Sequence, residues 1–358
     1  MITTDDVRAR LARVRYPGFQ RDIVTFGMVR DVAVRDATVL VVLAPGSAKP
    51  EVLATLRERI EEELRTLPGV RGVEVQVAVP DRAEAARSPF DERAPLPGVD
   101  RIVAVASGKG GVGKSTVAVH LALALQRLGL RVGLLDADIY GPSVPLMMGA
   151  ADARPTMADE KKIVPIERHG VALVSMGFFL DDRSPVIWRG PMVMSIVRQF
   201  LKDVVWGERD VLVVDLPPGT GDAQLTLLQQ VPVAGGVIVT TPQDVALLDV
   251  KRGIAMFETV NTPILGLIEN MSVFVCPTCG EQDPIFGREG GRREAEALGV
   301  PFLGALPLVP ALRAGLDRGL PLLVTEPEHP VSRAFMTIAE AVRATLARAG
   351  GASGRTVG

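Results

Sequence analysis

The sequence predicts an α/β fold in which a mostly parallel β-sheet carries helices on both faces and is preceded by a smaller α/β domain. Three observations support this fold class. Beyond residue 100, nearly unbroken runs of Val, Ile and Leu alternate with segments of helical spacing, as is typical of parallel strands buried on both faces. A glycine-rich turn joins the first of those strands to a helix. The length of 358 residues exceeds that of one small domain, so a second unit is expected.

Residues 1–82 form the predicted small domain, with the order helix, strand, strand, helix, strand. The supporting segments are, in chain order, "TTDDVRARLARV", the two halves of "VRDVAVRDATVLVVLAP", "EVLATLRERIEEELRTL" and "VRGVEVQVAV". The helices show helical spacing of apolar residues and the strands are rich in alternating β-branched residues. Residues 83–99 mix charge, Ala and Pro without either period, so a linker is predicted there.

Residues 100–347 form the predicted larger domain, and residues 348–358 a flexible tail. The predicted elements of the larger domain are, in chain order, the strand "RIVAVAS", the helix "KSTVAVHLALALQRLG", the strands "RVGLLDAD" and "VALVSMG", the helix "MVMSIVRQFLKDV", the strands "DVLVVDLP" and "GGVIVTTP", the helix "VALLDVKRGIAMFETV", and the strands "PILGLIENM" and "PFLGALPL". Ligands of such sheets bind at the carboxyl ends of the strands. The functional residues are therefore expected in the loops that follow the strands.

Composition excludes several classes of protein. Apolar residues make up 47% of the chain and charged residues 23%, with a formal net charge of −2, which argues against disorder and against a broad nucleic-acid-binding surface. The N-terminus has no apolar signal-peptide core, and no window reaches the roughly 18 apolar residues of a membrane helix. A cytoplasmic protein without nucleic-acid or membrane partners is expected.

The glycine-rich turn has the sequence "GKGGVGKS" and fits the pattern of a phosphate-binding P-loop. It follows a buried strand and opens a helix, so its backbone N–H groups can surround a phosphate. Lys114 is expected to contact the β- and γ-phosphates, and the Ser115 hydroxyl to ligate Mg²⁺. The residues of the turn predicted to bind nucleotide are Gly108, Gly110, Gly111, Val112, Gly113, Lys114, Ser115 and Thr116.

Carboxylates follow two other predicted strands. Asp215 ends "VLVVD" and suits the water shell of Mg²⁺. Asp138 is expected to orient the attacking water or act as a base, whereas Asp136 is equally well explained as a cap or turn former. The second lysine of the turn, Lys109, is by itself most simply a solvated loop residue.

The two cysteines, Cys276 and Cys279, form a CxxC pair after a predicted strand. That spacing is typical of metal sites, but Zn²⁺ and iron–sulfur clusters usually need four ligands. The three histidines, His120, His169 and His329, are distant in sequence. A symmetric dimer would join two pairs into a four-cysteine site. Spacing alone does not separate Zn²⁺ from a 4Fe-4S cluster; a thioredoxin-type redox motif would open a helix instead.

The turn with its additional Lys109 resembles the deviant phosphate loop of the ATPase group that includes nitrogenase iron protein, arsenite-pump ATPases and the partition and septum-positioning ATPases. This resemblance implies that Lys109 reaches the nucleotide of a partner subunit and compensates charge in the transition state. Together with Lys114 and Asp138, which were assigned above from the loop pattern and the strand end, Lys109 completes the set of predicted catalytic residues.

Within that group, residues 100–347 resemble the Mrp (ApbC-type) iron–sulfur cluster carrier ATPases. The resemblance lies in "GLIENMSVFVCPTCGEQDPIFGREGG", "DADIYGPSVPLMMG", "WRGPMV" and "DLPPGTGD". It implies a homodimer that hydrolyses ATP with Mg²⁺, binds a 4Fe-4S cluster on Cys276 and Cys279, receives it from a donor or scaffold and passes it to apoproteins. It also implies that Asn270 contacts adenine and that residues 219–221 sense the γ-phosphate.

The small domain resembles the iron–sulfur assembly domain often fused in front of such ATPases, through "YPGFQRDIVTFGMVRDVAV" and its element order, although it contains no cysteine. One alternative is a partition or septum-positioning ATPase whose CxxC pair is a structural zinc site. Such a protein needs a basic DNA-facing patch or a basic amphipathic terminal helix. A reductase similar to nitrogenase iron protein is disfavoured, because its cluster ligands come from two separated segments of each subunit.

Overall fold

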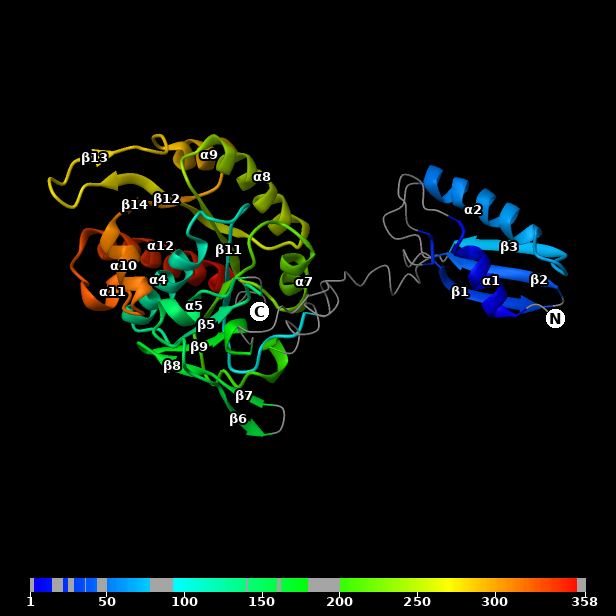
Figure 1. Cartoon of the computed structure of the whole chain (residues 1–358), viewed down its shortest axis with the longest axis horizontal. Coiled ribbons are helices and arrows are strands. Elements are labelled where there is room, and N and C mark those ends of the chain that lie inside the picture. Colours follow the sequence, from blue (N-terminus) through cyan, green and yellow to red (C-terminus); the bar gives the residue numbers. More distant parts are fainter. Residues whose placement is uncertain are drawn as a thin grey trace. The chain divides into compact units, whose positions relative to one another are not determined.

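The protein is described by a computed structural model covering residues 3–14, 22–24, 29–35, 37–43, 50–77, 93–139, 141–159, 162–179 and 200–352. The chain divides into two compact units, Met1–Ser88 and Pro89–Gly358, which are described separately (Figure 1). Most of the predicted linker, the "WRGPMV" segment and the beginning of the predicted helix "MVMSIVRQFLKDV" lie outside the described residues.

The first unit contains α1 (Thr4–Leu11), β1 (Val29–Arg35), β2 (Thr38–Leu43), α2 (Pro50–Arg65) and β3 (Gly72–Val77), which confirms the predicted order. Strand β2 pairs antiparallel with β1 and parallel with β3. Val39, Val41 and Leu43 of β2 are fully buried because alternate residues of a strand point to the same face. They share one core with residues of α1 and α2 such as Leu11 and Ile60.

Within the described residues, the second unit is built on a nine-stranded sheet of order β13-β12-β11-β4-β10-β5-β9-β8, with β14 also paired to β12. Its strands are β4 (Ile102–Ala106), β5 (Val132–Asp136), β8 (Ile166–Arg168), β9 (Val171–Ser175), β10 (Val211–Asp215), β11 (Gly235–Thr240), β12 (Ile264–Val275), β13 (Gln282–Asp283) and β14 (Phe302–Leu308). Only the pairs β8–β9 and β12–β13 are antiparallel among the described strands of this sheet. The predicted mostly parallel sheet is confirmed.

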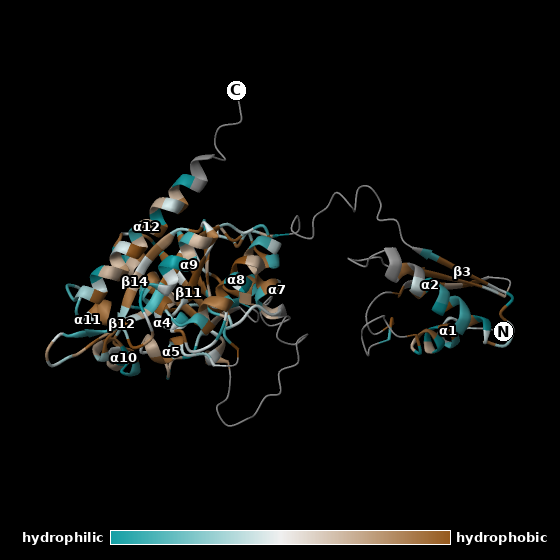
Figure 2. Cartoon of the chain, turned by 90° about the horizontal axis from the view of Figure 1, so that it is seen from above, coloured by the Kyte–Doolittle hydropathy of each residue, from teal (hydrophilic) through white to brown (hydrophobic). Residues whose placement is uncertain are grey.

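Helices cover both faces of this sheet. They are α4 (Lys114–Arg127), α5 (Val144–Met147), α7 (Asp222–Gln230), α8 (Asp244–Thr259), α9 (Gly290–Leu298), α10 (Pro310–Asp317), α11 (Leu322–Thr325) and α12 (Pro330–Ala352). Val103 and Val105 of β4 belong to the core shared with α4 and α12, whereas Ala104 belongs to the core on the other face, with residues of α7 and α8. Strands buried on both faces are mostly apolar, and β11, which is buried at every position, accordingly appears mainly brown in Figure 2.

Several elements were not predicted from the sequence. Strands β6 (Thr156–Asp159) and β7 (Lys162–Val164) form a separate antiparallel pair, and a 3₁₀ turn covers Met176–Phe178. The amphipathic segment "VSRAFMTIAEAVRATLARAG" was expected to form a final helix docked on the sheet, and it forms α12, which packs on α4 and β14. This helix continues through Ala352, so it overlaps the first residues of the predicted tail. Within the described parts of the chain, no helix combines the length and the apolar character needed to cross a bilayer.

Candidate functional site

The P-loop lies between β4 and α4, at the carboxyl end of the central strands. Gly113 is the N-cap of α4 in the left-handed region, with φ = 80°. A Cβ atom on Gly113 would collide with the side-chain amide of Asn270, and one on Gly108 would collide with Asp249 of α8. These two glycines therefore allow neighbouring elements to approach the loop backbone closely.

Lys114 and Asp215 form a buried ion pair beneath the loop. The Lys114 Nζ atom lies 2.5 Å from Asp215 Oδ1, and the side chains are 6% and 0% exposed. Burial raises the pKa of Asp215, and the Lys114 ammonium acts in the opposite direction. The second oxygen, Asp215 Oδ2, is buried without a hydrogen-bond partner among the residues that the structure describes. The site thus presents a buried cation together with an uncommitted carboxylate oxygen.

Asp136 lies beside Asp215 in the register of β5 and β10. It accepts hydrogen bonds from the Asp138 N–H at 3.1 Å, from the Val144 N–H at 3.3 Å and from the Ser175 hydroxyl at 2.8 Å. Burial, together with the Asp215 carboxylate, raises the pKa of Asp136 to about 7. Asp136 therefore organises the loop that follows β5, which agrees with its interpretation as a turn former.

Two adjoining cavities open at the P-loop. The first has a volume of about 220 Å³ and is lined by P-loop residues together with Asp138 and Pro218. Asp138 is 9% exposed, and its Oδ1 accepts from the Gly141 N–H at 3.3 Å. Lys109, predicted either to be solvated or to point toward a partner, is partly exposed and also lines this cavity. The backbone N–H groups of the loop and the ammonium groups of Lys109 and Lys114 make the first cavity suitable for phosphates.

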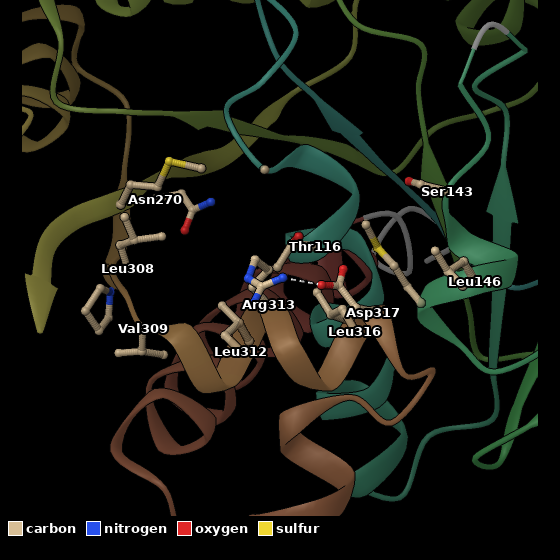
Figure 3. Close-up of a pocket in the computed structure, with 14 residues that line it drawn as sticks. Thr116, Ser143, Leu146, Asn270, Leu308, Val309, Leu312, Arg313, Leu316 and Asp317 are labelled. Carbon is tan, nitrogen blue, oxygen red and sulfur yellow. Dashed lines mark hydrogen bonds and ion pairs between the residues drawn. The ribbon is translucent and has the colours of Figure 1, made fainter. Parts of the chain in front are cut away.

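The second cavity, of about 290 Å³, is more apolar and shares Gly113, Thr116, Ser143 and Met147 with the first. Figure 3 shows Leu312 and Leu316 of α10 on one side of it, and Asn270 and Leu308 on another. An ion pair of 2.5 Å between Arg313 and Asp317 lies at its edge. An apolar cavity with a few polar groups beside a phosphate site suits a nucleotide base.

Asn270, predicted to contact adenine, lines the second cavity and also supports the P-loop. Its Nδ2 donates a hydrogen bond of 2.9 Å to the Val112 carbonyl, and the residue is 4% exposed. The segment 219–221 lies beside the same loop: the Gly219 N–H donates to the Ser107 carbonyl at 3.0 Å. Gln224 holds this segment through hydrogen bonds of 3.1 and 2.8 Å to the carbonyls of Pro217 and Pro218.

The two cysteines lie in a tight turn between β12 and β13. Cys276 exchanges backbone hydrogen bonds of 2.9 Å with Glu281 and Gly280. Both cysteines are free thiols, with Cys276 partly exposed and Cys279 exposed. The backbone N–H groups of Cys279 and Thr278 hold the pKa of the Cys276 thiol below its usual range, which favours the thiolate that binds metal. No group of three or more His, Cys, Asp or Glu side chains suited to a metal ion occurs among the described residues.

Sequence reasoning missed several residues of this site. Gln224, Met271 and the α10 residues were not singled out, although Met271 lies inside a quoted segment. The α10 side chains reach the cavity from nearly two hundred residues beyond the P-loop, so no local spacing connects them to it. Gln224 lies three residues after Gly221, and an amide side chain so close to a glycine-rich turn was the available signal.

The family profile described as NUBPL iron-transfer P-loop NTPase matches residues 98–343, and that of an iron-sulfur cluster assembly protein matches residues 4–77. An iron-sulfur cluster carrier protein of Synechocystis is 45% identical over 356 residues, covering 98% of this chain and 99% of that protein. A nucleotide-binding protein of Archaeoglobus fulgidus, solved with ADP, is 37% identical with a TM-score of 0.58 over 69% of this chain and 96% of its own. The cell division ATPase MinD of Pyrococcus furiosus shares the fold, with a TM-score of 0.53 and 24% identity over 68% of this chain and 99% of its own.

Proposed function

The chain belongs to the family of NUBPL iron-transfer P-loop NTPases and is an ATPase of that family. We propose that it carries a 4Fe-4S cluster on a homodimer and transfers the cluster to apoproteins under the control of ATP. The observation that carries the proposal is the exposed Cys276–Cys279 turn, which extends from the same strand that supports the P-loop. Two thiols at the end of a strand that also contacts the nucleotide site suit the binding of a cargo that responds to the bound nucleotide.

The two cavities divide the nucleotide between them in this proposal. The phosphates occupy the first, where Lys114 exchanges Asp215 for the β- and γ-phosphates. The base occupies the second, beside Asn270. Oxygen donors are what Mg²⁺ requires, and the Ser115 hydroxyl with the uncommitted Asp215 Oδ2 fits that preference. When bound, Mg²⁺ neutralises charge on the phosphates.

Hydrolysis requires a positioned water and compensation of the developing charge. Asp138, buried in the wall of the phosphate cavity, orients the water. Lys109, partly exposed in the same wall, acts on the nucleotide of the partner subunit. A dimer that brings two P-loops face to face makes each subunit depend on the other for turnover.

The cluster is the cargo of this protein. One chain contains two cysteines, and a 4Fe-4S cluster takes four thiolates, so two copies of the Cys276–Cys279 turn complete the site on a two-fold axis. The exposed position of Cys279 allows thiols of an acceptor protein to reach the cluster and replace the carrier's ligands. A donor or scaffold loads the site by the reverse exchange.

Anaerobic reconstitution with iron and sulfide tests this function. About four irons and four sulfides per dimer are expected, transferable to an apo-enzyme that requires the cluster. Cys276→Ala and Cys279→Ala lose the cluster, whereas the control Thr278→Ala, in the same turn, retains it. Iron, sulfide and zinc analysis, absorption spectra and light-scattering mass provide the readout. Stoichiometric zinc that iron does not displace would favour a structural zinc site, and no metal at all would leave the cysteines without a cargo. Either result would contradict the carrier function.

A further inference from the structure

Strand β12 connects the nucleotide site to the cysteine turn without interruption. The strand spans Ile264–Val275, so it begins in the core of the sheet and ends one residue before Cys276. Within it, Asn270 is hydrogen-bonded to the P-loop through the Val112 carbonyl. Met271 follows directly and lines the cavity assigned to the base. Only the four residues 272–275 therefore separate Met271 from the first cysteine.

The backbone of β12 is irregular at the residue that lines this cavity. Met271 has φ = 57°, a left-handed conformation that bulky side chains rarely adopt. The pairing with β14 slips at the same place: Asn270 is opposite Leu306 and Phe274 opposite Leu308, so residues 271–273 face one residue of β14. Such bulges re-aim a strand, and strained backbone persists mainly at functional sites.

The cysteine-bearing segment also returns to the same point of β12. Helix α9 begins at Gly290, and the Gly291 N–H donates a hydrogen bond of 2.5 Å to Glu269 Oε2. Glu269 is 2% exposed. The excursion of residues 271–290 therefore begins and ends at the adjacent residues Asn270 and Glu269. A change in backbone geometry at this point alters both ends of the segment that holds the cysteines.

We propose that Met271 is a positioning residue through which a nucleotide base in the second cavity sets the geometry of the Cys276–Cys279 turn. The base contacts the Met271 side chain, and the bulge of β12 transmits the change along the strand. This inference rests on the proposed function in assigning the base to that cavity and the cargo to the turn. A ligand shifts a conformational equilibrium only by its differential affinity for the two states. By linkage, ligation of the cysteines changes nucleotide affinity by the same factor.

Alkylation of the cysteines in the reduced, metal-free full chain tests this coupling without iron. The chain contains no other cysteine, so every iodoacetamide adduct reports on the turn. We expect saturating Mg-ADP to change the wild-type alkylation rate by at least about fivefold, because about fivefold is the lower limit of the coupling that is typical between two sites. Each variant is compared with and without Mg-ADP at saturation for its own measured Kd, so a change in affinity alone does not alter the result.

Two variants distinguish transmission of the nucleotide signal through Met271 from a general effect of losing a side chain from the cavity. Met271→Gly removes the side chain and tolerates the left-handed backbone, so the fold is kept while the response to Mg-ADP is lost. Met147→Ala removes a thioether from the same cavity but lies on α5, and its response is retained. An unchanged response in Met271→Gly, an equal loss in Met147→Ala, or a wild-type rate insensitive to bound Mg-ADP would overturn the inference. Failure of reconstitution with an intact response would instead overturn the carrier function alone.

Discussion

Replacement of Gly113 by Ala provides a quantitative test of how the P-loop is held. A Cβ atom at this position would collide with the Asn270 amide and would have to adopt φ = 80°. The left-handed conformation costs a non-glycine residue about 1–2 kcal/mol. Displacing Asn270 removes its hydrogen bond to Val112, which contributes about 1 kcal/mol. We expect the free energy of unfolding of the larger unit to fall by about 2–3 kcal/mol.

Gly111→Ala is the matched control for this substitution. Gly111 lies in the same loop with φ = 82°, but a Cβ atom there would meet nothing within 4 Å, so only the conformational cost of about 1–2 kcal/mol applies. Urea unfolding followed by tryptophan fluorescence reports on the larger unit, because Trp206 is buried in its core and residues 1–88 contain no tryptophan. Equal losses of stability in the two variants would refute the claim that the contact between Asn270 and the loop stabilises the site.

Three further predictions concern catalysis, pH and the segment that carries the cysteines. Lys109→Ala and Lys114→Ala should each abolish ATP hydrolysis, but a mixture of the two variants should recover about a quarter of wild-type activity. About half of randomly formed dimers contain one subunit of each variant, and each of these mixed dimers has one of its two sites restored. No recovery would show that Lys109 acts within its own subunit. Burial raises the pKa of Asp136 to about 7, so the folded state binds the proton of this carboxyl group more tightly than the unfolded state does. The contribution of the protonated Asp136 to stability is therefore lost as pH rises from about 4 to about 7. The stability of wild type relative to Asp136→Asn, measured by urea unfolding, should therefore decline over that range, and a parallel pH dependence of the two proteins would contradict the assignment. Glu269→Ala should lower the free energy of unfolding by about 1–3 kcal/mol because it leaves the Gly291 N–H buried without its acceptor, whereas Glu269→Gln, which keeps an acceptor oxygen, should lose clearly less in the same assay.

The sequence predicted those parts of the site that depend on local pattern. The P-loop was identifiable because its glycines, its lysine and the strand before it are contiguous, and Asp215 because it ends an apolar strand. The fold class followed from strands that are apolar along nearly their whole length, as are β4 and, up to its final Asp215, β10. Each of these inferences needs only neighbouring residues and the rule that parallel strands place their carboxyl ends at one edge.

The remaining parts of the site depend on contacts between distant segments. Asn270 could be assigned to adenine only by resemblance, and its hydrogen bond to Val112 joins residues 158 positions apart. The cavity wall formed by α10 has no sequence signal of its own, because a cavity is defined by all the elements that surround it. The left-handed backbone of Met271 likewise has no sequence signal. The β6–β7 pair was missed because strands of four and three residues are too short to show a period.

The ion pair between Lys114 and Asp215 has a consequence for turnover. Lys114 has a counter-ion within the fold, the Asp215 carboxylate, so the protein itself compensates the charge of this buried ammonium group. An arriving nucleotide must compete with this internal anion, which lowers its net affinity by the strength of the pair. The same pair re-forms as the phosphates depart, and it thereby opposes rebinding. We therefore expect Asp215 to make nucleotide release easier than the donors of the loop alone would allow.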